Sequence, residues 1–146
     1  MNKYHTIWDL SVKNLVYDRT TIHNIGYPIV WSVKYRRQVL VGKVEKTLKR
    51  LLSEIAEEKG FCIKQMECDK DHIHVFASAK PKVSPSYIYK MLKGISARKL
   101  FGIHPELKKK LWGGHLWNPS TYIETIGHIS EETVRKYIED QKSEQK

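Results

Sequence analysis

The chain has 146 residues, a length that usually corresponds to one domain. Apolar residues make up 40% of it, which is enough for a packed core and excludes a wholly disordered protein. The longest apolar runs are too short to span a bilayer, and no signal peptide is visible, so we expect a cytoplasmic protein with no membrane partner. Cys62 and Cys68 lie about 20 Å apart on an expected strand and should remain reduced.

The net charge is +10 and is unevenly distributed along the chain. Residues 124–146 carry a net charge of −2, whereas residues 1–123 carry a net charge of +12. A basic body followed by a mildly acidic segment indicates a surface that binds a polyanion such as nucleic acid. Charge alone is weak evidence, because many basic proteins are merely soluble.

The first half of the chain alternates between strand and helix patterns. Residues 1–24 are an N-terminal extension of uncertain structure, and residues 25–146 are expected to form a single domain. The β-branched and aromatic run 29–33 predicts a strand. A helix ending near Gly60 is predicted by apolar residues at helical spacing, which are Val44, Leu48, Leu51, Leu52 and Ile55.

The second half begins with two strands, over 61–68 and 72–77, which a tight turn should join into a hairpin. A second helix with an apolar stripe follows, then a further strand within 115–126, and a last helix over 130–141. This order predicts an α+β fold, a ferredoxin-like antiparallel sheet with two helices on one face plus a C-terminal helix that carries a tyrosine.

Two histidines on the predicted second strand of the hairpin are candidate metal ligands. His72 and His74 are two residues apart, so they point to the same face of the sheet, while Ile73 and Val75 face the helices. Two imidazoles placed in this way can chelate one divalent metal. A lone His-x-His pair also occurs by chance, so a structural role for both residues stays open.

The last predicted helix carries a candidate nucleophile. Tyr137 and Gln141 are four residues apart and share one helical face. A phenol can attack a phosphate that a metal polarises and leave a covalent phosphotyrosine, and Gln141 could add an amide oxygen to the metal. Val134 and Ile138 lie beside them, and this helix taken alone favours Tyr137 as a core aromatic of an amphipathic helix over a nucleophile.

Basic residues on the first strand's end and on the second helix are candidates for DNA binding. Positive side chains with aromatic neighbours suit phosphate contact and base stacking on single strands. A solvated helix face would look the same from the sequence. The candidate DNA-binding residues are Lys34, Arg36, Arg37, Lys93 and Arg98.

Together these segments resemble the single-tyrosine HUH transposases of small insertion sequences, including the REP-associated tyrosine transposases. The resemblance runs from about Tyr27 to Gln141, in the order and spacing of that family. It is carried by five segments, Trp31–Arg37, Asp71–Phe76, Leu92–Arg98, Leu111–Trp117 and Lys136–Gln141.

The resemblance implies a function and a set of roles. His72 and His74 would bind a magnesium or manganese ion, Tyr137 would be the nucleophile, and Gln141 would be the third ligand. The enzyme would be a metal-dependent DNA strand transferase that cleaves and rejoins single-stranded DNA at insertion-sequence ends through a 5′-phosphotyrosine. Hairpin-containing DNA and a second copy of the chain, as a homodimer, are the implied partners.

Two features depart from the family, and two other functions stay open. Residues 1–24 do not match the family's usual short start, and Pro28 stands where relatives often have a histidine. One alternative is a domesticated relative that acts on chromosomal repeat hairpins with the same chemistry. The other is a non-catalytic module that binds single-stranded nucleic acid, in which the histidines and Tyr137 are structural.

Overall fold

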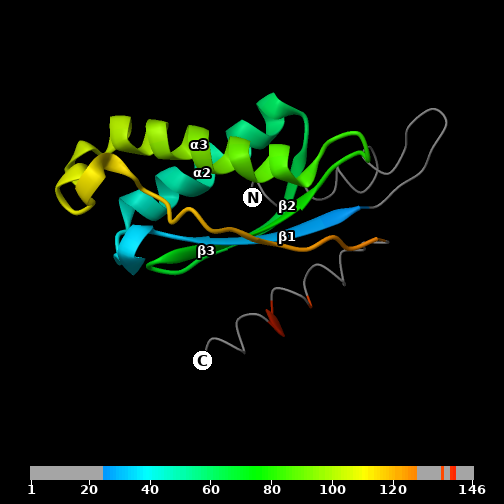
Figure 1. Cartoon of the computed structure of the whole chain (residues 1–146), viewed down its shortest axis with the longest axis horizontal. Coiled ribbons are helices and arrows are strands. Elements are labelled where there is room, and N and C mark those ends of the chain that lie inside the picture. Colours follow the sequence, from blue (N-terminus) through cyan, green and yellow to red (C-terminus); the bar gives the residue numbers. More distant parts are fainter. Residues whose placement is uncertain (1–24, 128–135, 137–138, 141–146) are drawn as a thin grey trace.

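The computed structural model describes residues 25–127, 136 and 139–140 (Figure 1). In chain order its main elements are β1 (Gly26–Ser32), η1 (Lys34–Arg36), α2 (Lys43–Lys59), β2 (Cys62–Cys68), β3 (His72–Ser78), α3 (Pro85–Ile103), η2 (Pro105–Lys109), η3 (Trp112–Gly114) and β4 (Tyr122–Ile123). None of the helices in this described part is long and apolar enough to cross a membrane.

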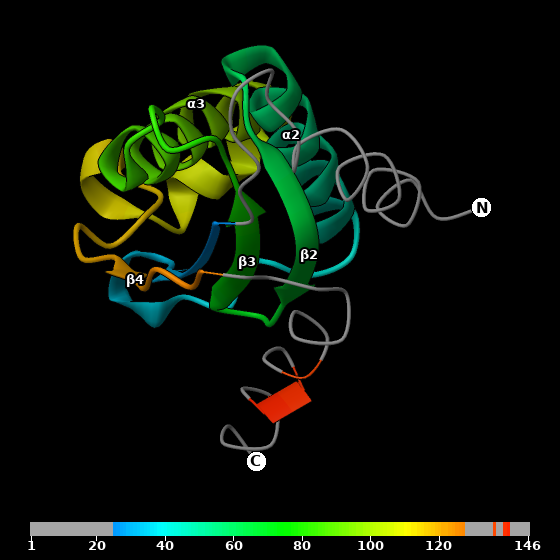
Figure 2. The same ribbon diagram turned by 90° about the vertical axis from the view of Figure 1, so that its right-hand side faces the viewer.

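The four strands form one antiparallel sheet in the order β2-β3-β1-β4. Helices α2 and α3 lie side by side on one face of it, as the two views in Figures 1 and 2 agree. Helix α2 connects β1 to β2, and α3 connects β3 to β4, which is the connectivity of a ferredoxin-like fold. The predicted α+β architecture is therefore confirmed.

The core lies between the sheet and the two helices, and it follows from the side-chain periodicity of each element. On β3, Ile73 and Val75 are buried toward the helices, so the residues between them face the other way. Leu48 and Leu52 are completely buried on α2, one helical turn apart. Burying a leucine side chain of this kind contributes about 1.5–3 kcal/mol, so this interface orients β3 firmly.

The ends of the helices have local causes. Helix α2 ends at Gly60, which adopts a left-handed conformation (φ 84°) and donates its N–H to the carbonyl of Ala56. Glycine takes this conformation without the strain that a Cβ would cause. Helix α3 begins after Ser84, whose hydroxyl accepts a hydrogen bond of 3.1 Å from the backbone N–H of Tyr87.

Two predicted elements differ in detail from the structure. The strand expected within 115–126 is reduced to the two residues of β4, with isolated bridges at Trp117 and Ile126 on either side. The segment Lys34–Arg36, expected to close the first strand, is a tight 3-10 turn instead. In the predicted C-terminal helix, Lys136 and the pair 139–140 are helical and exposed, and the rest lies outside the described residues.

Candidate active site

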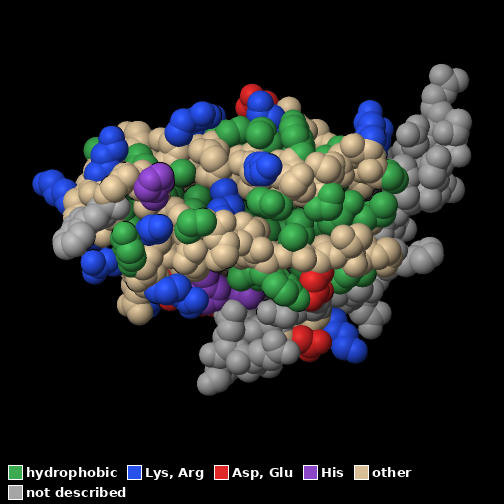
Figure 3. Space-filling model, viewed as in Figure 1, with side chains coloured by type: hydrophobic (Ala, Val, Ile, Leu, Met, Phe, Trp, Pro, Cys, Tyr) green, Lys and Arg blue, Asp and Glu red, His purple; other side chains and the backbone are tan. Residues whose placement is uncertain are grey.

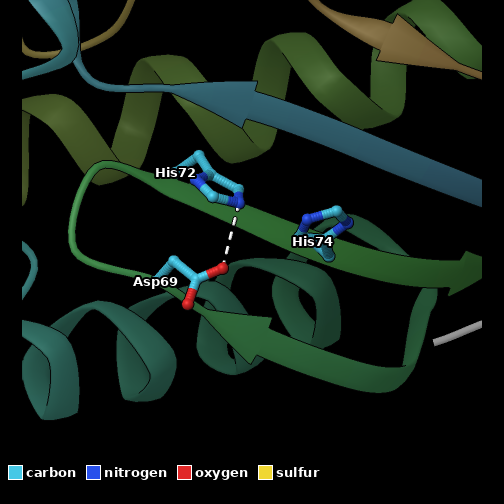
Figure 4. A group of neighbouring side chains, drawn as sticks. All are labelled: Asp69, His72 and His74. Atoms are coloured by element: carbon cyan, nitrogen blue, oxygen red, sulfur yellow. Dashed lines mark ion pairs between the residues drawn. The ribbon is translucent and has the colours of Figure 1, made fainter. Parts of the chain in front are cut away.

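His72 and His74 extend from β3 on the face of the sheet opposite the helices, as the alternation of the strand predicts (Figure 4). Their rings approach each other edge to face, with centroids 5.1 Å apart. The His72 side chain is 13% exposed and His74 is 5% exposed, so little of either residue is in contact with water. The predicted pair of imidazoles thus exists as a compact, largely desolvated group.

A carboxylate completes a possible metal-binding group. Asp69 lies in the turn between β2 and β3, and its Oδ2 atom is 3.1 Å from Nε2 of His72 (Figure 4). Ligand atoms of Asp69, His72 and His74 all lie within 4.8 Å of one another. Nε2 of His72 is buried, and its contact with Oδ2 of Asp69 lacks the geometry of a hydrogen bond, so both atoms could serve as ligands of one ion. A mixed imidazole and carboxylate set suits a divalent ion such as Mn²⁺, and the residues present fit such a group.

The electrostatics of His74 favour its metal-binding form. Burial lowers the pKa of His74, and the neighbouring His72 lowers it further, while Asp69 and Glu67 oppose the change. A lowered pKa keeps the imidazole neutral near pH 7. Only the neutral ring has the lone pair that a metal needs.

A second carboxylate holds His72 from its other side. Oδ1 of Asp71 lies 2.7 Å from Nδ1 of His72, and Oδ2 of Asp71 accepts a hydrogen bond of 3.0 Å from Nε of Arg36. Burial raises the pKa of Asp71, but the hydrogen bonds from His72 and Arg36 outweigh it and hold this pKa below its usual value. The carboxylate therefore stays ionised.

Neither Asp69 nor Asp71 was among the site residues predicted from the sequence. The signal for them was present, since both acidic residues belong to the hairpin turn and lie within three positions of His72. The two other predicted catalytic residues, Tyr137 and Gln141, lie outside the described residues. Their predicted roles therefore stay predictions.

Three of the five candidate DNA-binding residues are exposed, as such a role requires, and a fourth, Lys34, is half-buried. Arg36, Arg37 and Arg98 are exposed, and the Lys34 ammonium lies 5.4 Å from the ring centroid of Tyr35. Arg37 also lines a cavity of about 210 Å³ together with Gln38, Val39, Lys109 and Lys110. Figure 3 shows Lys and Arg side chains grouped at the end of the molecule that holds η1 and η2, where acidic side chains are few.

Lys93 is placed differently from the other four candidates. Its ammonium donates to the carbonyl oxygen of Asn118 and to the hydroxyl of Thr121, each at 2.8 Å, with two further carbonyl oxygens at 3.2 and 3.4 Å. Burial also lowers the pKa of Lys93. The side chain is therefore engaged in holding the loop before β4, and a DNA contact would have to compete with these bonds.

The chain is similar to transposases over most of its length. Residues 21–141 match the profile of the family described as "Transposase IS200 like". The ISDra2 transposase TnpA of Deinococcus radiodurans is 45% identical over 123 residues, which cover 84% of this chain and 88% of that protein. The transposase of insertion sequence element IS200 from Salmonella typhimurium is 33% identical over 123 residues, covering 84% of this chain and 80% of that protein.

Solved structures show the same likeness. A crystal structure from Deinococcus radiodurans R1, assigned as a transposase, matches with a TM-score of 0.71 and 38% identity, covering 86% of this chain and 96% of that one. A REP-associated tyrosine transposase bound to a REP hairpin matches with a TM-score of 0.54 over 82% of this chain and 66% of that one. At 16% identity, this second likeness concerns the fold alone.

Proposed function

Because the chain belongs to the IS200-like transposase family, we propose that it cleaves and rejoins single-stranded DNA at insertion-sequence ends through a 5′-phosphotyrosine intermediate. The observation that carries this proposal is the group of Asp69, His72 and His74, with a buried Nε2 atom available for a metal. We assign the activity to residues 25–146 as a single catalytic domain that acts in the cytoplasm of its cell.

In this proposal, His72 and His74 hold a magnesium or manganese ion, and Gln141 supplies a third protein ligand. When bound, the ion polarises a non-bridging oxygen of the scissile phosphate and thereby makes the phosphorus more electrophilic. Asp69 lies beside Nε2 of His72, so it adds negative charge at the rim of the site. This charge favours a divalent cation over a monovalent one.

Tyr137 provides the nucleophile. Its phenolic oxygen attacks the phosphorus and forms a bond to the 5′-phosphate, while the bond from phosphorus to the 3′-oxygen breaks. The phenol loses its proton to solvent, and the leaving 3′-oxygen gains one to become a hydroxyl. The reverse attack by a 3′-hydroxyl rejoins strands and frees the tyrosine. The phosphotyrosine conserves the energy of the phosphodiester, so no nucleotide cofactor is required.

The proposed substrate is single-stranded DNA that contains a hairpin. The relative of similar fold that is bound to a REP hairpin supports this class of ligand. The basic surface around η1 and η2, which includes Arg36 and Arg37, supplies positive charge for the phosphate backbone. We propose a homodimer as the working form, in which the helix that carries Tyr137 can complete the site of either subunit.

An adduct assay tests the proposed reaction. The protein is incubated with Mn²⁺ and hairpin DNA from its own flanking sequence, labelled at either the 5′ or the 3′ end. We expect a covalent adduct stable in SDS that retains the 3′-labelled downstream fragment and is lost in the Tyr137→Phe and His72→Ala variants. A free 5′-phosphate without adduct would indicate a water-dependent nuclease, and hairpin binding without any cleavage would indicate a binding module. Either result would contradict the proposal.

A further inference from the structure

Two carboxylates lie beside the His72 ring, one at each of its nitrogen atoms. Asp69 faces Nε2, the ring nitrogen directed toward His74, whereas Asp71 faces Nδ1 on the opposite edge of the ring. A neutral imidazole carries one proton, and its position decides which nitrogen has a lone pair for a metal. The Nδ1 contact to Asp71, at 2.7 Å, has the geometry of a hydrogen bond, whereas the Nε2 contact to Asp69, at 3.1 Å, does not. The proton is therefore favoured on Nδ1, with the lone pair on Nε2.

Asp71 is itself held in place from two directions. Its backbone carbonyl accepts a hydrogen bond of 2.8 Å from the N–H of Val33, which ties the hairpin turn to the end of β1. Its side chain accepts from Nε of Arg36 at 3.0 Å. The two carboxylate oxygens have separate partners, so rotation that breaks the bond to His72 would also break the bond to Arg36.

The backbone around Arg36 is strained in a way that supports this arrangement. Tyr35 and Arg36 both adopt left-handed conformations (φ 60° and 54°), which cost a non-glycine residue about 1–2 kcal/mol each. Such a conformation persists only where surrounding bonds hold it. Here the turn is fixed by N–H groups of Lys34 and Arg36, which donate to Leu116 and Val33. The turn directs the guanidinium of Arg36 to Asp71.

We propose that Asp71 is a positioning residue, which accepts the Nδ1 proton of His72 and directs Nε2 of that ring to the metal, with Arg36 holding the Asp71 carboxylate. This inference rests on the proposed metal-binding role of His72. Partners of this kind orient metal-binding histidines and raise the basicity of the ligating nitrogen. Arg36 has a smaller effect, because its side chain is 63% exposed and its ion pair is screened by water.

The first measurement is the Mn²⁺ affinity of the DNA-free protein. The electron paramagnetic resonance signal of the free ion reports how much Mn²⁺ remains unbound at each point of the titration. We expect Asp71→Asn to weaken binding roughly 10- to 100-fold, Arg36→Gln to weaken it only a few-fold, and Asp71→Glu to recover part of the loss. Glu106→Gln is the matched control, because Glu106 also pairs with a histidine. Its Oε1 atom lies 3.2 Å from Nδ1 of His104, and this pair is not part of the proposed metal site. The control variant should leave the affinity unchanged. An Asp71→Asn affinity within twofold of the unmodified protein would overturn the proposal.

The second measurement needs no metal. Long-range proton–nitrogen NMR at alkaline pH distinguishes the two neutral tautomers and so reports which nitrogen of His72 carries the proton. We expect Nδ1–H in the unmodified protein and a shift toward Nε2–H in Asp71→Asn. If His72→Ala leaves Mn²⁺ affinity unchanged, the proposed metal site is wrong, and the NMR result still decides the role of Asp71. If the proton of His72 lies on Nε2 in the unmodified protein, the proposed role of Asp71 is wrong.

Discussion

Lys64 is a buried lysine on β2, and replacing it should change how stability depends on pH. The residue is only 3% exposed and lies at the irregularity in the pairing of β2 with β3. Burial lowers the pKa of Lys64 from 10.5 to about 8, and the partial compensation from Cys62 does not cancel it. The folded protein therefore disfavours the ammonium form relative to the unfolded chain.

The size and sign of the effect follow from these two pKa values. Well below pH 8 the lysine is protonated in both states, so the full penalty of about 3.5 kcal/mol is present, since each pKa unit corresponds to about 1.4 kcal/mol. Between pH 8 and 10.5 the folded state releases its proton while the unfolded chain keeps it. The unfolded state then binds more protons, and the free energy of unfolding rises with pH. Above this range the penalty is gone.

The comparison of the unmodified protein with Lys64→Met isolates this effect. Urea unfolding followed by tryptophan fluorescence, at pH 7 to 10, gives the difference in free energy of unfolding at each pH. We expect the methionine variant to be more stable at pH 7 and to lose about 2–3 kcal/mol of this advantage by pH 10. Cys68, whose pKa is raised, titrates in both proteins, whereas the pKa of Cys62 depends on Lys64, so both proteins carry Cys62→Ala in this comparison. A difference that stays constant from pH 7 to 10 would refute the reasoning.

Other predictions concern the support of the sheet and the helix ends. Ser96→Ala should cost about 1–3 kcal/mol because it removes the acceptor of the buried Trp117 Nε1–H, and the same change should be nearly neutral in a Trp117→Phe background. Lys93→Met should speed amide exchange in the loop after Trp117, and unchanged exchange would contradict the bonds assigned to its ammonium. Gly60→Ala, at a left-handed position, should lower stability by about 1 kcal/mol, whereas Gly94→Ala, in an exposed turn of α3, should raise it by about 0.5–1 kcal/mol in denaturant titrations.

The parts of the fold that could be predicted from the sequence are those governed by local periodicity. The helical spacing of Leu48 and Leu52 predicts α2, and Gly60 predicts its end, because both signals act within one helical turn. The alternation of β3 places His72 and His74 together on the face away from the helices. The pairing of the two imidazoles was therefore predictable, because residues two apart on a strand must share a face.

The parts that could not be predicted depend on contacts between distant segments. Nothing in a Lys-Tyr-Arg sequence signals two left-handed residues, since neither Tyr35 nor Arg36 is a residue type that favours this conformation. The basic pattern of α3 makes Lys93 a plausible DNA contact. Its bonds to a loop 25 residues away follow only from how α3 packs beside that loop. Asp69 and Asp71 are a different case, because both lie within three residues of His72 and the hairpin turn could have indicated them from the sequence.

The central claim is that Tyr137 becomes covalently attached to the 5′-phosphate of cleaved DNA. The most direct measurement is mass spectrometry of the purified adduct after nuclease and trypsin digestion. Cleavage after Lys136 and Lys142 releases the peptide 137–142, which contains Tyr137 as its only tyrosine. The account predicts that this peptide carries a nucleotide 5′-phosphate on the tyrosine. A nucleotide attached to any other residue, or cleaved DNA with no attached peptide, would contradict it.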